Sequence, residues 1–377
     1  MIPGGAGWFG CRLLLTEPRR LLAAVAAVAA ATLILAIQLG FFFGVIDTQA
    51  RFADVIQGDL VLLHRAQTHL DRWNELEGIR PYQAGGVAGV ERVVPVYRGG
   101  LRWENRADGS WRRVVGLALP PDGLLLDLPG RAGLAEQLRV PGQVLFDRLS
   151  RDLYGAPAPG DSVLLDGQHY RLGGYFELGP NLVYDGLVLM STLDWLRLHP
   201  RDTPLFALVE LESGAPLAEV RERLRRALPD DIVVLTPNEL RAREVSFTVS
   251  AAPIGYIFGL GAALGLLVGL IFCYQVLYNL VLDHQRPIAT LRAMGFADGY
   301  LARAVLAQAL LIACLGALPG LLASHGAYAA VAAASQMAMQ LSPARAAAIA
   351  VGTLLFCLLA GLAAARRLGH FDPAELL

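Results

Sequence analysis

Residues 21–43 read LLAAVAAVAAATLILAIQLGFFF, and this run assigns the chain to a structural class. No charged side chain occurs between Arg20 and Asp47, a stretch of 26 residues. A helix that crosses a bilayer needs about 20 apolar residues, so the stretch predicts transmembrane helix 1 at residues 21–46. A cleaved signal peptide is the alternative. Its apolar core usually spans only ~7–15 residues, which favours a retained helix.

Three further apolar runs lie in the last third of the chain. They predict transmembrane helix 2 at residues 251–282, helix 3 at 304–329 and helix 4 at 346–365. Charged residues make up 17% of the chain, against about 25% in a typical soluble domain. The expected fold class is therefore an α-helical membrane protein with four transmembrane helices and a mixed α/β extracytoplasmic domain between the first and second helices.

Arginine gathers in the short segments on one side of the predicted helices. The N-terminal segment 1–20, the loop 283–303 and the tail 366–377 each carry two or three arginines, whereas the short loop 330–345 carries one. Short loops rich in arginine stay in the cytoplasm. Both termini are therefore expected to be cytoplasmic, and the domain at 47–250 is expected to lie outside together with the loop 330–345.

The segment between helices 1 and 2 has the pattern of a mixed α/β domain. Residues 47–252 contain 23 arginines and 28 acidic residues, a net charge of about −5 (23 − 28), which argues against nucleic-acid binding. Residues 216–228 predict a helix, because apolar side chains recur on one face. Runs typical of strands occur at 59–64, 91–97, 113–119, 162–165, 170–176, 187–190 and 205–211.

The basic residues are all arginine, and this excludes one class of function. The ATP-binding loop of the Walker type needs a lysine after its glycines, and the sequence contains no lysine. The four cysteines and the histidines show no spacing typical of a metal site. We therefore expect no catalytic residue, no metal and no cofactor on this chain, which would not itself be an enzyme.

A helix start lies just before helix 2. Thr236–Glu239 matches a capping box, with Pro237 at the first helical position. A helix running on to Leu282 would have 46 residues and a length of roughly 69 Å, against a bilayer core of about 30 Å. The excess predicts a stalk beneath the domain. The alternative is a separate helix that ends near Ser250, before Pro253.

Glycines recur at a spacing of four residues in helices 2 and 3. Small residues at this spacing let helix backbones approach closely, so we expect a helix-packing or dimer face in helix 2. Packing between helices of one chain explains the pattern nearly as well, but four helices can hardly enclose a pathway alone, which favours a dimer. The glycines of helix 2 are Gly255, Gly259, Gly261, Gly265 and Gly269, and those of helix 3 are Gly316 and Gly320.

The loop between helices 2 and 3 predicts a short amphipathic helix. Pro287 favours its start and Gly295 favours its end. Ile288, Leu291 and Met294 would then share one apolar face. Such a helix either lies at the membrane surface or docks in the groove of a partner, and the residues alone leave both open.

This loop also carries a resemblance. Residues 288–296, IATLRAMGF, resemble the cytoplasmic loop of the FtsX/MacB-like permeases of ABC transporters, and residues 372–377, DPAELL, are similar to the C-terminal signature of that family. The family usually has a glutamate at the start of the loop helix, where this chain has Pro287. This chain therefore has no carboxylate at that position to contact an ATPase.

A narrower resemblance points to the DevC branch of this family. PIGYIFGLG at 253–261 and YQVLY at 274–278 are similar to DevC, as are QLGF at 38–41 and PYQA at 81–84. The chain thus resembles a DevC-like permease subunit of the FtsX/MacB-type, or mechanotransmission, ABC transporters. The resemblance covers nearly the whole chain and is weakest at residues 101–183.

The resemblance implies a function and a set of partners. Two copies of the chain would work in the bacterial inner membrane with two copies of a separate ABC ATP-binding subunit, which binds ATP and Mg. Movement would pass to the periplasmic domain, and a membrane-fusion protein and an outer-membrane channel would complete an exporter of a lipid or other hydrophobic compound. The loop helix would be the coupling helix, with ATPase-coupling residues Arg286, Pro287, Ile288, Leu291, Arg292, Met294 and Gly295.

Two other functions stay open from the sequence. One is an FtsX-like transmembrane signalling relay, in which ATP hydrolysis moves the outer domain to control a periplasmic cell-wall hydrolase without transport. The other is a membrane-anchored enzyme with its active site in the domain at 47–250.

Overall fold

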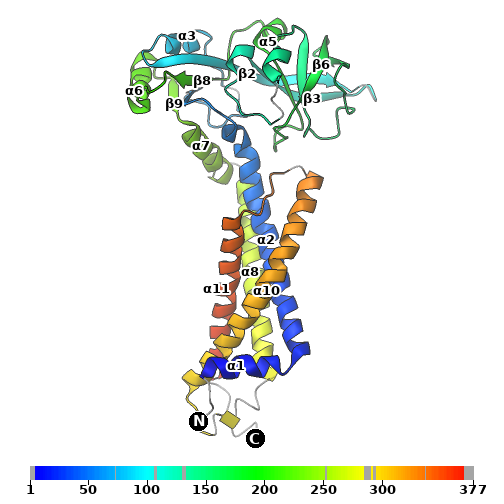
Figure 1. The fold of residues 1–377 in the computed structure, drawn as a ribbon, viewed down its shortest axis with the longest axis vertical. Helices are drawn as coiled ribbons and strands as arrows, with labels where there is room; N and C mark the ends of the chain where they lie inside the picture. Colours follow the sequence, from blue (N-terminus) through cyan, green and yellow to red (C-terminus); the bar gives the residue numbers. More distant parts are fainter. Residues whose placement is uncertain are drawn as a thin grey trace. The chain divides into compact units, whose positions relative to one another are not determined.

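The computed structural model describes residues 5–72, 74–105, 108–129, 133–250, 253–283, 290–291, 294–335 and 337–368 (Figure 1). The chain divides into two compact units, which we call the helical unit and the α/β unit. The helical unit comprises Met1–Gly44, Ile254–Ser335 and Met339–Leu377, and the α/β unit comprises Val45–Pro253 and Gln336–Ala338.

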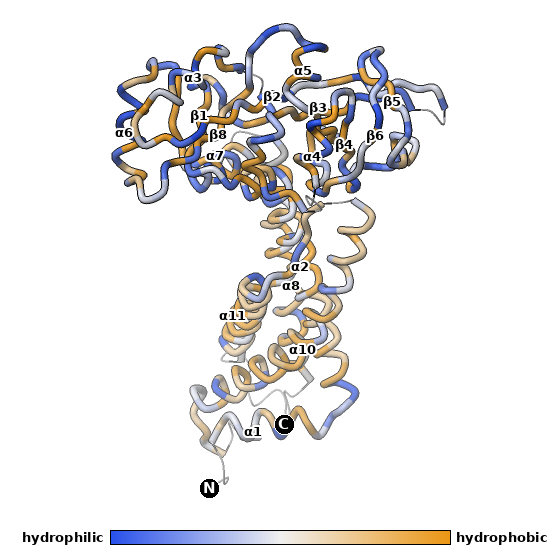
Figure 2. The backbone as a smooth tube through the Cα atoms, turned by 45° about the horizontal axis from the view of Figure 1, so that its top comes forward, coloured by the Kyte–Doolittle hydropathy of each residue, from blue (hydrophilic) through white to orange (hydrophobic). Residues whose placement is uncertain are grey.

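Four long helices form most of the helical unit. They are α2 (Pro18–Asp54, in this unit up to Gly44), α8 (Pro253–Asp283), α10 (Asp298–Ser335) and α11 (Pro343–Leu368). Each is long and apolar enough to cross a membrane, and Figure 2 shows that hydrophobic residues predominate along them. The chain is therefore a multi-pass membrane protein. The helices share a core of small and branched side chains that includes Val28, Cys273, Ile312 and Cys357.

A further helix, α1 (Ala6–Leu15), was not expected from the sequence. It packs on α10, where Gln308 Nε2 donates a hydrogen bond of 3.2 Å to the carbonyl oxygen of Gly10. A Cβ atom at Gly10 would overlap the backbone of Ala304, so glycine is what lets these two helices approach. Leu14 is fully buried in the core of the helical unit.

A nine-stranded mixed sheet forms the α/β unit, in the order β3-β7-β4-β6-β5-β2-β8-β1-β9. Because β3 also pairs with β2, six strands close into a ring, and β8, β1 and β9 extend from β2 as an arm. The strands are β1 (Leu60–His64), β2 (Val90–Glu104), β3 (Trp111–Leu119), β4 (Gln143–Asp147), β5 (Ser162–Leu165), β6 (Gln168–Phe176), β7 (Leu187–Ser191), β8 (Phe206–Leu211) and β9 (Ile232–Leu235).

The long strand β2 belongs to both the ring and the arm. Its residues Val90–Val96 pair with β8, and its residues Tyr97–Glu104 pair with β3. The ring encloses an aromatic core around Trp103, Phe146 and Tyr154. The short helices of the unit are α3 (Ile79–Gly85), the 3₁₀ turn η1 (Pro121–Gly123), α4 (Leu134–Leu138), α5 (Thr192–Leu198) and α6 (Leu217–Ala227).

The structure confirms the fold class expected from the sequence: four apolar helices, with a mixed α/β domain between the first and the second. All seven runs typical of strands overlap strands, two of them starting one residue too early, but β4 and β9 were not predicted. α6 buries Val220, Leu224 and the following Leu228 as expected, whereas Leu217 is 39% exposed.

The capping box before helix 2 forms as expected and begins α7 (Pro237–Ser250). Thr236 N–H donates to Glu239 Oε2 at 2.9 Å, and Glu239 N–H donates to Thr236 Oγ1 at 3.2 Å. α7 ends at Ser250 and α8 begins at Pro253. Residues 251–252, on which the single continuous helix depends, lie outside the described residues.

Candidate functional site

A buried ion pair lies at the centre of the α/β unit. Arg98 is on β2, the strand shared by the ring and the arm, and its Nη2 lies 2.5 Å from Asp71 Oδ1. Arg98 Nη1 donates to the carbonyl oxygen of Leu70 at 2.9 Å, and Asn181 Nδ2 donates to Asp71 Oδ2 at 2.9 Å. Desolvating two charges is costly, and these extra hydrogen bonds offset part of that cost.

Helix α7 is tied to the same loop through a buried carboxyl group. Glu244 Oε1 accepts a hydrogen bond of 2.8 Å from the N–H of Leu70. Burial raises the pKa of Glu244 to about 7. One turn further along α7, the Phe247 ring stacks on His69 with 4.0 Å between ring centroids. The loop that bears Asp71 is thus held by α7 on one side and by β2 on the other.

The last turns of α2 are tied to the segment at 178–182. Arg51 Nη1 donates to the carbonyl oxygen of Leu178 at 2.8 Å. Gln49 Oε1 accepts a hydrogen bond of 3.2 Å from the N–H of Leu182. The neighbouring Phe52 packs edge-on against Phe206 of β8, with 5.6 Å between ring centroids. This end of α2 therefore contacts both the loop and the sheet.

The two helices are also joined directly, because Arg241 Nε on α7 lies 2.8 Å from Asp54 Oδ1 at the end of α2. We call the buried and half-buried groups that hold α2 and α7 to the sheet the helix-anchoring cluster. It consists of Gln49, Arg51, Asp71, Arg98, Asn181 and Glu244. Its bonds connect α7 to β2 through the loop at Leu70 and Asp71, and they connect α2 to that loop through the segment at 178–182.

The coupling segment expected at 286–295 is described only in part. Residues 284–289 and 292–293, among them Arg286, Pro287, Ile288 and Arg292, lie outside the described residues. Thr290 accepts a hydrogen bond of 3.0 Å from the N–H of Met294, as in a helical turn. Gly295 has φ +87°, a left-handed conformation typical of a helix end. Leu291 is 5% exposed and Met294 is 62% exposed, so of these two Met294 is the one available to a partner.

Four of the glycines face α2 of the same chain, namely Gly261 and Gly265 of α8 and Gly316 and Gly320 of α10. A Cβ atom at Gly265 would lie 2.5 Å from Gln38 Cγ, and one at Gly261 would lie 3.3 Å from Gln38 Oε1. Gly320 of α10 has the carbonyl oxygen of Ala29 at 2.8 Å from its Cβ position. The spacing of the glycines was compatible with packing within one chain and with a dimer. These contacts show packing within one chain, and the dimer stays a prediction.

The other glycines of α8 are less crowded. Cβ atoms at Gly259 and Gly269 would have their nearest neighbours at 3.8 and 3.9 Å, an ordinary contact distance. Gly255 lies in the first turn of α8. The close approach of α8 to α2 therefore centres on Gly261 and Gly265.

Sequence reasoning named no member of the helix-anchoring cluster. The sequence held one indication of a buried ion pair. Arg98 follows the apolar run VVPVY, and a charged residue in such a strand is unusual unless it is paired. In the described part of the chain, no group of three or more His, Cys, Asp or Glu side chains is arranged to hold a metal. His169 instead contacts Ser162, with 3.2 Å between Nδ1 and Oγ.

Comparison with protein families identifies the C-terminal part of the chain. Residues 244–373 match the model of a family described as FtsX-like permease C-terminal. The chain carries an FtsX-like permease domain. This domain contains α8, α10 and α11, and it begins at Glu244, the α7 residue of the helix-anchoring cluster.

Among curated proteins the chain has no match. Three solved structures are similar to about half of the chain. The extracellular domain of the noncanonic ABC-type transporter YknZ from Gram-positive bacteria is 16% identical, with a TM-score of 0.36; the match covers 47% of this chain and 99% of that one. The periplasmic region of MacB from Actinobacillus actinomycetemcomitans is 10% identical, with a TM-score of 0.36 and coverages of 50% and 92%. A domain of a permease protein from Porphyromonas gingivalis is 20% identical, with a TM-score of 0.32 and coverages of 48% and 90%.

Proposed function

We propose that the chain is the permease subunit of an ABC exporter, driven by ATP hydrolysis on a separate subunit. In this proposal movement of the transmembrane helices is delivered to the α/β unit, which lies in the periplasm of the bacterial inner membrane with both termini in the cytoplasm. The observation that carries the proposal is the helix-anchoring cluster. In it α7 bonds the loop at Leu70, which Arg98 of β2 also bonds, and α2 bonds the segment at 178–182, whose Asn181 bonds Asp71 of that loop. A buried network of paired charges at this place supports a mechanical role for this part of the α/β unit.

The ATPase would act on the loop between α8 and α10. Met294 is exposed there and is followed by Gly295 in a left-handed conformation, as expected of a short helix that presents an apolar side chain to a groove. The proposal includes two ATP-binding subunits carrying ATP and Mg, a second copy of this chain, a membrane-fusion protein and an outer-membrane channel. The DevC-like cargo, a lipid or another hydrophobic compound, belongs to the proposal as well.

Reconstitution with the ATPase encoded beside the gene tests this function. We expect Met294→Asp to abolish assembly with the ATPase and the ATP turnover that depends on the permease, because it places a charge in an apolar groove. Leu193→Asp is the matched control, since Leu193 is 67% exposed on α5 of the α/β unit. Normal assembly and turnover with Met294→Asp would refute the coupling role. Normal turnover in vesicles that move no hydrophobic cargo would instead support the signalling relay.

A further inference from the structure

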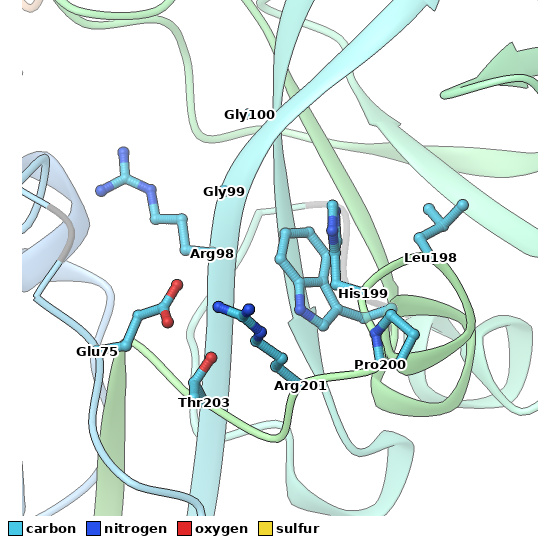
Figure 3. Close-up of a pocket in the computed structure, with 10 residues that line it drawn as sticks. Glu75, Arg98, Gly99, Gly100, Leu198, His199, Pro200, Arg201 and Thr203 are labelled. Atoms are coloured by element: carbon cyan, nitrogen blue, oxygen red, sulfur yellow. The ribbon is translucent and has the colours of Figure 1, made fainter.

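A cavity of about 340 Å³ opens beside the middle of β2, within the α/β unit (Figure 3). Its walls include Arg98, Gly99 and Gly100 of β2, together with Trp195 and Arg201 from α5 and the segment that follows it. The volume lies at the lower end of the range of about 300–1,000 Å³ found for small-ligand sites. The cavity is separate from the coupling segment and uses none of its residues.

Hydrogen bonds show which edge of β2 the backbone N–H and C=O groups of each residue face. Asn105 N–H donates to Ser110 O at 2.8 Å on the β3 side of the strand. Arg102 O accepts from Asp166 N–H at 2.9 Å, and Val96 O accepts from Leu205 N–H at 2.8 Å. Neighbouring residues of a strand point their backbone groups to opposite edges, so the even-numbered residues of β2 face the edge away from β3.

That edge is open where the cavity lies. β8 pairs with β2 only as far as Val96, and β5 pairs with it at Trp103. Between these two residues, no strand of the described chain pairs with this edge of β2. The N–H and C=O groups of Arg98 and Gly100 point to the gap, and both residues line the cavity. The sheet thus lacks one short strand between β8 and β5.

The cavity walls add side-chain chemistry to this backbone edge. Figure 3 shows the carboxylate of Glu75 and the guanidinium of Arg201 turned toward the same space beside the strand. No ion pair within 4.0 Å joins them to any described residue. The Trp195 ring covers Gly99, whose Cβ position is 2.9 Å from that ring, and gives the cavity an apolar wall. His199 Nε2 is buried there without a hydrogen-bond partner among the described residues.

We infer that this cavity is a peptide-binding site, in which an extended segment of a partner protein adds as a strand to the open edge of β2. Its backbone would exchange hydrogen bonds with Arg98 and Gly100, as in other cases of strand addition. A segment of about five residues, roughly 17 Å long, fits between the end of β8 and β5. An acidic side chain of the segment would meet Arg201 and a basic one would meet Glu75.

Photolabelling of the full chain in lipid nanodiscs tests the site. The probes are two capped pentapeptides, acetyl-Glu-Val-X-Val-Lys-amide and acetyl-Lys-Val-X-Val-Glu-amide, where X is a diazirine analogue of leucine. Saturable labelling by at least one probe is expected within residues 195–201 or at Glu75. Arg201→Ala and Glu75→Ala alter exposed side chains and should weaken labelling by that probe.

N-methylation of the probe separates strand addition from simple side-chain binding. Methyl groups on the two backbone nitrogens that face Arg98 and Gly100 should reduce labelling about 30-fold, through loss of two hydrogen bonds worth about 1 kcal/mol each. Methyl groups on the alternate nitrogens should leave it unchanged. The inference is overturned if no saturable labelling occurs up to about 1 mM, if both methylated series label equally, or if labelling maps to other residues.

Discussion

Arg98 Nη2 on β2 lies 2.5 Å from Asp71 Oδ1, and the two side chains are only 4% and 7% exposed. Replacing Arg98 by methionine would leave the Asp71 carboxylate buried without its cation. We expect Arg98→Met to lower the free energy of unfolding of the α/β unit by about 3–5 kcal/mol, as is typical when one partner of a buried pair is removed. Thermal unfolding of the full chain, followed by limited proteolysis of the α/β unit, measures the effect.

The Arg139–Asp122 pair is the matched control, because its side chains are 60% and 78% exposed. Arg139→Met should leave the stability nearly unchanged, because solvent screens an exposed pair. The double variant Arg98→Met with Asp71→Leu should recover most of the lost stability, because it removes both charges. Equal effects of the two single variants would contradict the anchoring role of Arg98.

Burial raises the pKa of Glu244 to about 7, and this predicts a dependence of stability on pH. The folded pKa lies above the ordinary glutamate value of about 4.3, so the contribution to stability is complete below pH ~4.3 and is lost as the pH rises through 7. The charges facing this carboxyl group are those of Asp71, Arg98 and Arg243. Glu244→Gln keeps an oxygen for the N–H of Leu70 and should flatten the profile, with a gain of up to about 3 kcal/mol at pH 8.

Unfolding temperatures of the full chain between pH 4.5 and 8 measure this profile. A shallow slope should remain in Glu244→Gln, because burial also raises the pKa of Asp147 in the same unit. Parallel curves for the wild type and Glu244→Gln would show that Glu244 does not titrate in this range.

The fold class was predictable because its signal is local. In an uncharged run as long as residues 21–46, one helix can satisfy the hydrogen bonds of all backbone N–H and C=O groups, independently of the rest of the chain. Strands such as β5 and β7 were found for a similar reason, since their apolar runs are continuous. β4 (QVLFD) begins and ends with polar residues, so its pairing with β6 and β7 decides its structure. β9 (IVVL) is as long as β5 and fully apolar, so its sequence did carry the signal of a strand.

The helix-anchoring cluster was beyond the reach of the sequence. Asp71, Arg98 and Glu244 are far apart along the chain, and they meet only because the loop after β1 lies between β2 and helix α7. The packing of the glycines was predictable only in part. Their spacing indicated close packing, but which helix they face depends on the three-dimensional arrangement of α2, α8 and α10.

Gly320 and Gly326 of α10 offer a matched test of this packing. A Cβ atom at Gly320 would lie 2.8 Å from the carbonyl oxygen of Ala29 and 2.7 Å from Thr32 Cβ, whereas Gly326 has nothing within 4 Å. We expect Gly320→Ala to lower the unfolding temperature in detergent, because backbone atoms of α2 must move. Gly326→Ala should leave it unchanged or raise it slightly, since alanine favours a helix by about 1 kcal/mol over glycine. The reverse order would contradict the contact between α10 and α2.

Cys273 of α8 and Cys357 of α11 test the packing of a second helix pair. Their sulfur atoms are 3.5 Å apart and both side chains are buried, so a movement of about 1.5 Å would bring them to the disulfide distance of about 2.05 Å. In a background with Cys11→Ala and Cys314→Ala, a membrane-permeant copper–phenanthroline oxidant should join peptides from α8 and α11 of the same chain. Mass spectrometry of the digested protein detects the linked peptides, and Cys273→Ala should abolish them. If linkage occurs only between two copies of the chain, α8 packs against a partner and not against its own α11.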